Sequence, residues 1–266
     1  MAKTAFITGA SSGIGKALAA ELARRGHDLF LTARRLDALE QVRAEIVDAD
    51  PHRRVEVRRL DVTDAPDVAV AISEAAGAFG RIDIVVANAG VGSSGPVGEG
   101  RMARERQVIE TNVIGAMATI DAAIAQFRLQ GGGQVVGVGS VAGARGLPTS
   151  GSYSASKAAV ATYLDAVRVE THREPITVTT IAPGYIDTPI NQDMKSRPFL
   201  ISVDKGAKVM ADLIERGVGY ATVPRFPWTI VVPLLRVLPT SLLARAMPDR
   251  EFSAPDDPAN GDADRP

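Results

Sequence analysis

Tyr153 and Lys157 are the first two residues whose types and spacing suggest chemistry. They stand four positions apart in the stretch GSYSASKAAV (151–160), and this spacing places two side chains on one face of a helix. A neighbouring ammonium group favours the ionised form of a tyrosine hydroxyl, so the pair could handle a proton. A Tyr and a Lys at this spacing also occur together by chance, so other residues must decide.

Two more polar residues belong to the candidate site. Ser140 follows a predicted strand, QVVGVG, and precedes Tyr153 by thirteen positions. Asn112 lies beside the apolar stripe of a long predicted helix. A buried amide needs hydrogen-bond partners, so Asn112 is either a satisfied core residue or a functional group.

Strand-like and helix-like segments alternate along the chain. The predicted strands are Thr4–Thr8, Leu29–Thr32, Val55–Leu60, Ile82–Ala87, Gln134–Gly139, Ile176–Ile181 and Tyr220–Val223. The predicted helices are Ile14–Arg25, Leu36–Asp48, Pro66–Phe79, Arg104–Leu129, Tyr153–Thr171 and Asp204–Arg216. This alternation predicts a doubly wound α/β fold of the Rossmann type, with a seven-stranded parallel sheet between two helical layers. In such folds ligands bind beyond the carboxyl ends of the strands.

The stretch TGASSGIG (8–15) joins the first predicted strand to the first predicted helix. Gly9, Gly13 and Gly15 permit a tight turn and a close approach of backbone to a pyrophosphate at the helix N-terminus. Ser11 and Ser12 add hydroxyl donors. The alternative is an ordinary glycine-rich turn, but the spacing favours a dinucleotide loop.

The end of the second predicted strand indicates which dinucleotide is preferred. Ala33 stands where an NAD site usually carries an acid, and Arg34 and Arg35 follow it. A guanidinium group matches the 2′-phosphate of NADP(H), so we predict that cofactor, chiefly through Arg34. Two solvated arginines at a helix start are the alternative.

In this order and spacing, residues 3–223 resemble the short-chain dehydrogenase/reductase family. TGASSGIG resembles the cofactor loop of the family, and Asn88, Ala89 and Gly90 resemble its Asn-Ala-Gly turn, although Ala87 stands where many members have a further Asn. Asn112, Ser140, Tyr153 and Lys157 match the catalytic tetrad of the family. The resemblance implies that the cofactor contacts come from Gly9, Ser11, Ser12, Gly13, Ile14, Gly15, Arg34, Arg35, Asp61, Val62, Asn88, Ala89, Gly90, Tyr153, Lys157, Pro183, Gly184, Ile186 and Thr188.

The resemblance also implies an activity: an NADP(H)-dependent oxidoreductase that interconverts a secondary alcohol and a ketone, or reduces an aldehyde. Ser140 would hydrogen-bond the substrate oxygen and Tyr153 would exchange the proton. Lys157 would lower the Tyr153 pKa from about 10, and Asn112 would hold a water that links Lys157 to solvent. The same resemblance implies a homodimer or homotetramer that packs through the helices carrying Asn112 and Tyr153.

Composition excludes several classes of protein. Apolar residues make up 45% of the 266 positions, which is enough for one large domain, and the net charge of −1 indicates no nucleic-acid partner. The absence of cysteine rules out thiolate nucleophiles, and the 3 histidines are widely separated, so we predict no metal site. The N-terminus lacks a signal-peptide pattern, so we expect a cytoplasmic location.

The expected organisation is one dinucleotide-binding and catalytic domain over residues 1–248. Residues 185–202 form a long connection that we interpret as a substrate loop, and 249–266 have the composition of a disordered tail. Residues 226–247 are apolar but too interrupted by proline and arginine to span a membrane. They could cover the pocket, meet a second subunit or rest on a membrane surface, of which the membrane surface is less favoured.

Two alternative functions remain at this stage. One is a membrane-peripheral reductase of a lipid or steroid type. The other is an NADP-sensing binding protein without turnover, which would have little need of Tyr153 and Lys157 together.

Overall fold

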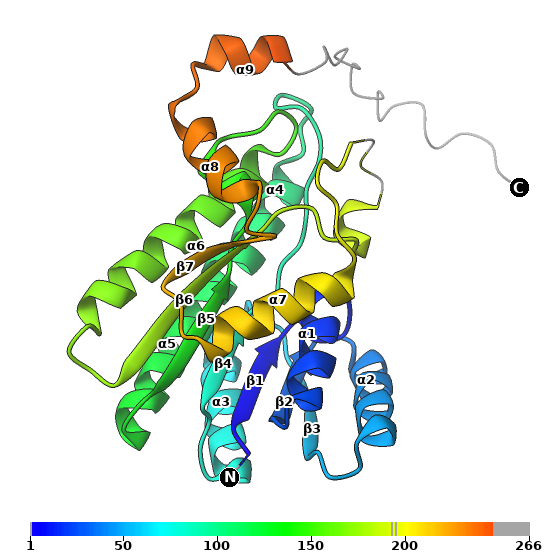
Figure 1. Cartoon of the computed structure of the whole chain (residues 1–266), viewed down its shortest axis with the longest axis vertical. Coiled ribbons are helices and arrows are strands. Elements are labelled where there is room, and N and C mark those ends of the chain that lie inside the picture. Colours follow the sequence, from blue (N-terminus) through cyan, green and yellow to red (C-terminus); the bar gives the residue numbers. More distant parts are fainter. Residues whose placement is uncertain (1, 193, 195, 247–266) are drawn as a thin grey trace, which may run out of the picture.

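Seven short runs of mostly apolar and β-branched residues form one parallel sheet (Figure 1). The computed structural model describes residues 2–192, 194 and 196–246. The strands run in the order β3-β2-β1-β4-β5-β6-β7, and every neighbouring pair is parallel. They are β1 (Thr4–Thr8), β2 (Asp28–Ala33), β3 (Val55–Arg59), β4 (Ile84–Ala87), β5 (Gly133–Val138), β6 (Ile176–Pro183) and β7 (Tyr220–Val223).

Helices connect the strands and cover both faces of the sheet (Figure 1). They are α1 (Gly13–Arg24), α2 (Leu36–Ala49), α3 (Ala65–Phe79), α4 (Met102–Ile109), α5 (Gly115–Gln130), α6 (Gly151–Glu170), α7 (Val203–Glu215), α8 (Trp228–Val237) and α9 (Thr240–Ala246). Short turns of helix are η1 (Glu110–Ile114), η2 (Val141–Ala144) and η3 (Pro189–Asn191). The doubly wound fold predicted from the sequence is confirmed.

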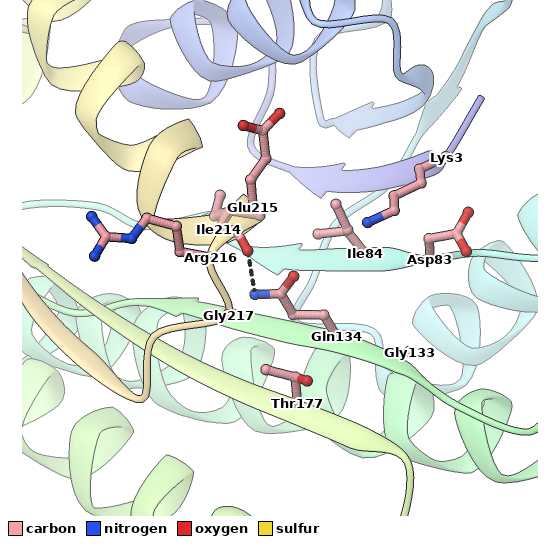
Figure 2. A pocket seen from close by; sticks show the side chains of 10 residues that line it. All are labelled: Lys3, Asp83, Ile84, Gly133, Gln134, Thr177, Ile214, Glu215, Arg216 and Gly217. Atoms are coloured by element: carbon pink, nitrogen blue, oxygen red, sulfur yellow. Dashed lines mark hydrogen bonds between the residues drawn. The ribbon is translucent and has the colours of Figure 1, made fainter. Parts of the chain in front are cut away.

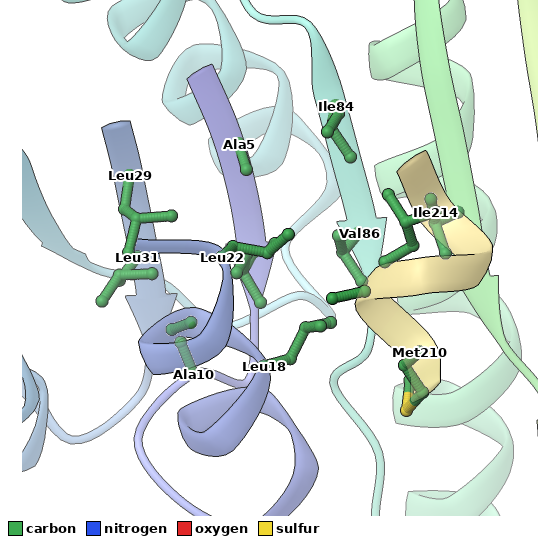
Figure 3. Close-up of a cluster of buried hydrophobic side chains, with 14 of the residues drawn as sticks. Ala5, Ala10, Leu18, Leu22, Leu29, Leu31, Ile84, Val86, Met210 and Ile214 are labelled. Carbon is green, nitrogen blue, oxygen red and sulfur yellow. The ribbon is translucent and has the colours of Figure 1, made fainter. Parts of the chain in front are cut away.

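Two apolar cores explain why the strands are apolar on both sides. In β1, Ala5 and Ile7 belong to a core with residues of α1, α2 and α7, whereas Phe6 belongs to the opposite core with residues of α3, α5 and α6. Figure 3 shows the first core, where Leu18 and Leu22 of α1 meet the sheet beside side chains of α7. Successive side chains of a strand point to opposite faces, so one strand serves both cores.

The long helix predicted at Arg104–Leu129 is divided in the structure. A π-helical turn, η1, separates α4 from α5 and contains Asn112. π turns are rare and often lie at functional sites, and the apolar spacing of the sequence does not distinguish one extra residue in a turn from continuous α-helix. Among the described residues, the stretch Met102–Gln130 is long and apolar enough to cross a membrane, but 50% of its apolar window is buried inside the molecule, as in a core helix.

The apolar segment after β7 forms two short helices. Trp228 and Val232 of α8 are buried, and α8 contacts η2 and β7. The predicted tail, 249–266, and residues 247 and 248 of the predicted domain lie outside the described residues. The single-domain boundary therefore stays a prediction.

Candidate active site

The glycine loop follows β1 and leads directly into α1. Gly9 and Gly13 have positive φ angles of 68° and 54°, which side chains rarely adopt. A Cβ at Gly15 would lie 2.3 Å from the Gly9 carbonyl oxygen and 2.5 Å from Asn88 Nδ2. Glycine is therefore required here to bring the loop and the helix start together.

Asn88, which follows β4, is hydrogen-bonded to the start of this loop. Its Nδ2 donates to the carbonyl oxygen of Thr8 over 2.9 Å, and the backbone amides of Asn88 and Ala89 donate to the Thr8 hydroxyl. The resemblance implied that Asn88 and Ala89 contact the cofactor. The structure shows that the Asn88 side chain supports the loop that would do so.

The N-terminus of α1 has the features of a phosphate site. Ser12 precedes the helix with extended backbone and makes no side-chain cap hydrogen bond. The first-turn amides of a helix point outward and carry a partial positive charge. Ser11 precedes Ser12 in the chain, and Ile14 packs against the core. Because glycines clear the approach and no side chain occupies the cap, a dinucleotide pyrophosphate fits this position.

The residues predicted to select the dinucleotide lie at the end of β2. Arg34 and Arg35 are exposed just beyond the buried Ala33. The Arg35 guanidinium is 3.4 Å from the Ser11 hydroxyl, while Arg34 has no hydrogen-bond or ion-pair partner within the described part of the chain. Arg34 is thus available to a bound anion.

Asp61 and Val62 follow β3 and have different surroundings. The exposed Asp61 carboxylate accepts hydrogen bonds from the backbone amide and the hydroxyl of Thr63. Val62 is buried, and a Cβ at Gly115 would lie 2.5 Å from its Cγ2. The Val62 side chain is therefore a core residue packed against the start of α5.

Ser140 caps η2 at the carboxyl end of β5. Its Oγ accepts a hydrogen bond from the Ala142 amide over 3.1 Å and lies 3.4 Å from the Pro183 carbonyl oxygen of β6. The Ser140 side chain also hydrogen-bonds with Tyr153 of α6. Two hydroxyl groups therefore meet beyond the ends of β5 and β6, where a carbonyl oxygen of a substrate could accept from both.

Tyr153 and Lys157 share a face of α6 as predicted, but their relation differs from the expected one. The Lys157 ammonium donates to the Val138 carbonyl oxygen over 2.9 Å and lies 5.8 Å from the Tyr153 ring centroid. Burial lowers the Lys157 pKa to about 8. Burial also raises the Tyr153 pKa, and the hydrogen bond with Ser140 acts in the opposite direction. The Ser140 hydrogen bond therefore favours the tyrosinate in this structure.

Asn112 is a satisfied core amide. Its Oδ1 accepts from the Val91 amide over 2.8 Å, and its Nδ2 donates to the Val91 carbonyl oxygen and the Ser156 hydroxyl. A Cβ at Gly90 would lie 3.3 Å from Asn112 Oδ1 and 3.5 Å from Lys157 Nζ. Asn112 thus ties the turn after β4 to α6, close to Lys157, with its own side chain fully engaged.

The segment after β6 closes the opposite side of the site. Thr188 is buried, and its hydroxyl donates a hydrogen bond to the Ile186 carbonyl oxygen. It lies next to the glycine loop, because a Cβ at Gly13 would be 3.6 Å from Thr188 Cβ. Ile186 is buried and forms a bridge with Ile201 at the other end of the predicted substrate loop. Gly184, next to Pro183, has the indole of Trp228 directly against it.

Trp228 is the site residue that sequence reasoning missed. Its ring packs against Tyr185 and Phe199, with centroid distances of 6.2 and 5.7 Å, and belongs to a small buried cluster with Val141 of η2. It is the single Trp of the chain and lies in an apolar segment. Its rarity could have drawn attention to it, but a sequence does not show which distant residues it contacts.

A separate cavity of about 310 Å³ lies at the other end of the sheet (Figure 2). Lys3, Asp83, Gln134 and Glu215 are among the residues that line it, and Gln134 Nε2 donates to the Ile214 carbonyl oxygen there. These residues stand at the amino ends of the strands. None of the predicted site residues lines this cavity, so it is not the candidate active site.

Comparisons with known proteins agree with this arrangement. The family model described as short chain dehydrogenase matches residues 3–198. An uncharacterized oxidoreductase of Mycobacterium tuberculosis is 38% identical over 241 residues, which cover 90% of this chain and 95% of that protein. A cis-4-hydroxycyclohexanecarboxylate dehydrogenase of Sinomonas cyclohexanicum is 39% identical over 189 residues, covering 71% and 75% of the two chains.

Solved structures share the fold across most of the chain. The alcohol dehydrogenase of the archaeon Thermococcus sibiricus, solved in complex with 5-hydroxy-NADP, superposes with a TM-score of 0.76 at 29% identity. The match covers 84% of this chain and 96% of that one.

Proposed function

The chain belongs to the short-chain dehydrogenase family, and from that premise we propose that it is an NADP(H)-dependent oxidoreductase that interconverts a secondary alcohol and a ketone, or reduces an aldehyde. The observation that carries the proposal is the meeting of Ser140 and Tyr153 beyond the ends of β5 and β6. Their hydroxyls face the same edge of the sheet as the glycine loop. A substrate oxygen and a nicotinamide ring can therefore be held side by side.

Each residue of the group has a role in this proposal. A bound nicotinamide supplies or accepts the hydride. Ser140 donates a hydrogen bond to the substrate oxygen and stabilises its developing charge. Tyr153 gives or takes the proton on that oxygen. Lys157 stands one turn along α6 as the buried positive charge, and Asn112 holds the turn after β4 in register with α6.

The preference for NADP(H) rests on the exposed cationic pair after β2. Arg34 is unpaired among the described residues, and Ala33 leaves the position of the usual ribose-binding acid without a carboxylate. A 2′-phosphate would find a guanidinium there. The similarity to an alcohol dehydrogenase solved with an NADP derivative supports the same direction.

The surroundings of the site favour an apolar substrate of moderate size. Tyr185, Phe199 and Trp228 pack together on the substrate side, and Leu200 stands exposed beside them. Apolar and aromatic linings bind substrates chiefly by removing apolar surface from water. A ketone or secondary alcohol on a ring or a short aliphatic chain suits this lining.

A binding protein without turnover is the weaker alternative, because it would not require Tyr153, Ser140 and Lys157 around one point. A homodimer or homotetramer built on the helices that carry Asn112 and Tyr153, and a cytoplasmic location, stay predictions.

The test is a kinetic screen of the purified full-length chain. NADPH oxidation is followed at fixed pH against ketones, aldehydes, quinones and steroids, and the best substrate is then assayed with NADPH and with NADH. We expect turnover of an apolar carbonyl compound and a higher kcat/KM for NADPH. A kcat/KM for NADH that equals or exceeds it would refute the cofactor assignment, and binding of NADPH without turnover of any substrate would favour the sensing alternative.

A further inference from the structure

Helix α8 is mostly apolar, but only one of its sides is buried. Trp228 and Val232 face the protein. The exposed side carries Ile230, Leu234 and Val237, and the exposed Phe226 stands just before the helix in the chain. These four side chains, which we call the α8 stripe, are exposed by 63%, 55%, 76% and 77% in that order.

Helical spacing places the three α8 members of the stripe on one face. Positions 230, 234 and 237 follow each other at intervals of four and three, which keeps side chains on one face of a helix. Single exposed apolar residues are normal on protein surfaces, but a continuous row marks an interaction site.

Within the segment that contains the stripe, residues 216–248, the charged side chains have one sign. From Arg216 to Pro248 the sequence contains no Asp or Glu, and it contains Arg216, Arg225, Arg236 and Arg245. Arg225 and Arg236 flank the stripe and are exposed. An arginine can lay its methylene groups on an apolar surface and keep its guanidinium in the polar layer above. The chemistry of this face is therefore complementary to an anionic lipid surface.

The stripe is presented by a helix that is fixed to the candidate active site. The Arg145 guanidinium, in the loop after Ser140, donates to the Thr240 hydroxyl over 2.7 Å and lies 3.5 Å from the Arg236 carbonyl oxygen. On the inner side, Trp228 packs against Gly184 and Phe199. Figure 1 shows α8 at the same end of the molecule as the segment before α7.

We propose that the α8 stripe binds the surface of an anionic lipid bilayer, with Arg225 and Arg236 among the headgroups. Helix α8 has 10 residues, which span about 15 Å, so it lies in the interface rather than crossing a core of about 30 Å. Phe199 and Trp228 then lie close to the membrane. If the proposed function holds, an apolar carbonyl substrate passes from the bilayer to Tyr153 along these rings.

The binding step is tested without any enzyme assay. The full-length chain is mixed with vesicles of phosphatidylcholine alone, or with a third of phosphatidylglycerol, and the bound fraction is measured by flotation at low and at high salt. We expect the chain to float with the anionic vesicles, to float less with neutral ones, and to be released by salt because screening weakens the arginine contribution.

Matched variants distinguish binding through the stripe from non-specific adsorption of the protein to vesicles. Ile230→Ser with Leu234→Ser should lower the partition coefficient by about tenfold or more, whereas Leu129→Ser with Val169→Ser, which are exposed on α5 and α6, should leave it unchanged. Arg225→Gln with Arg236→Gln should cost about fivefold per arginine on anionic vesicles only, and Arg106→Gln with Arg173→Gln should cost nothing. Circular dichroism and thermal melts verify that each variant is folded.

Two outcomes would overturn the proposal. The first is that the folded wild-type chain stays unbound to anionic vesicles. The second combines two observations: light scattering shows that the wild-type chain is a dimer and the Ile230→Ser/Leu234→Ser variant a monomer, and neither protein binds vesicles. That result would make the stripe a contact between two copies of the chain. Vesicle binding with no turnover of any carbonyl compound would leave the lipid surface established and refute only the proposed function.

Discussion

The Lys157 ammonium donates a hydrogen bond to the carbonyl oxygen of Val138 over 2.9 Å, which ties α6 to the last residue of β5. This lysine is 6% exposed, and no carboxylate accompanies it among the described residues that contact it. Its charge is held by a backbone dipole beside the Tyr153 ring. The candidate site therefore contains a buried positive charge that costs stability and lies beside the residue to which we assign the proton exchange.

The pH dependence of stability should reveal this cost. Burial lowers the Lys157 pKa from the ordinary lysine value of 10.5, which applies to the unfolded chain, to about 8 in the folded chain. Between these two pH values the unfolded chain binds more protons than the folded chain, so the Lys157 contribution to the unfolding free energy rises with pH. Relative to Lys157→Met, the wild-type chain should gain about 3 kcal/mol of unfolding free energy from pH 7.5 to pH 10.5.

Urea denaturation followed by Trp228 fluorescence measures that difference. Lys205→Met, at an exposed position of α7, is the control and should show a difference from wild type that does not change with pH. A flat difference for Lys157→Met as well would mean that Lys157 keeps its ordinary pKa in the folded chain.

Tyr153→Phe should abolish catalysis without disturbing the cofactor site. The substitution removes the hydroxyl that exchanges the proton, and general acid–base catalysis contributes about 10² to 10⁴ in rate. NADPH affinity, measured by fluorescence titration, should stay within about threefold because the ring and α6 are retained. Tyr163→Phe, on the same helix but outside the site, should turn over normally. Wild-type turnover by Tyr153→Phe would refute the role given to Tyr153.

Arg34→Gln should weaken the binding of NADPH and leave the binding of NADH unchanged. Loss of a charge-assisted hydrogen bond costs about 1.5 to 3 kcal/mol, so the KM for NADPH should rise about ten- to a hundredfold. The kcat/KM for NADH should change little, because NADH has no 2′-phosphate. Arg43→Gln, an exposed arginine of α2, serves as the control. An equal loss of kcat/KM with both cofactors would show that Arg34 supports the loop and does not bind the 2′-phosphate.

Gly15→Ala should damage the dinucleotide loop. The added Cβ would overlap the Gly9 carbonyl oxygen and the Asn88 amide, so we expect a loss of about 1 to 3 kcal/mol in stability and much weaker NADPH binding. Gly77→Ala, in α3 with no atom within 4 Å of the new Cβ, should instead stabilise the chain by about 0.5 to 1 kcal/mol. Thermal melts with and without NADPH compare the two, and intact binding by Gly15→Ala would contradict the packing described here.

Several features could be predicted from the sequence because they depend on local pattern. Short apolar runs that alternate with helical periodicity predict a parallel sheet covered on both faces, and β1 and β7 have the predicted bounds. Since parallel strands end at one edge, the glycine loop, Asn88, Ser140 and Pro183 had to meet there. The family resemblance then connected these positions with one chemistry.

Other features depend on contacts between distant segments, which no local pattern contains. The π turn around Asn112 follows from fitting Asn112 between Val91 and Ser156, and the bond from Lys157 to Val138 follows from how α6 lies on β5. The placement of Trp228 on Gly184 and the exposure of the α8 stripe follow from docking α8 beside η2.

The sequence by itself therefore determined the fold, the edge that carries the site and the residue types gathered there, because these follow from the periods of strand and helix. Only the tertiary structure decided which partner each polar group has, which charges are buried and which apolar face is left in water. Those are properties of packing, in which residues far apart in the chain compete for the same space and the same hydrogen bonds.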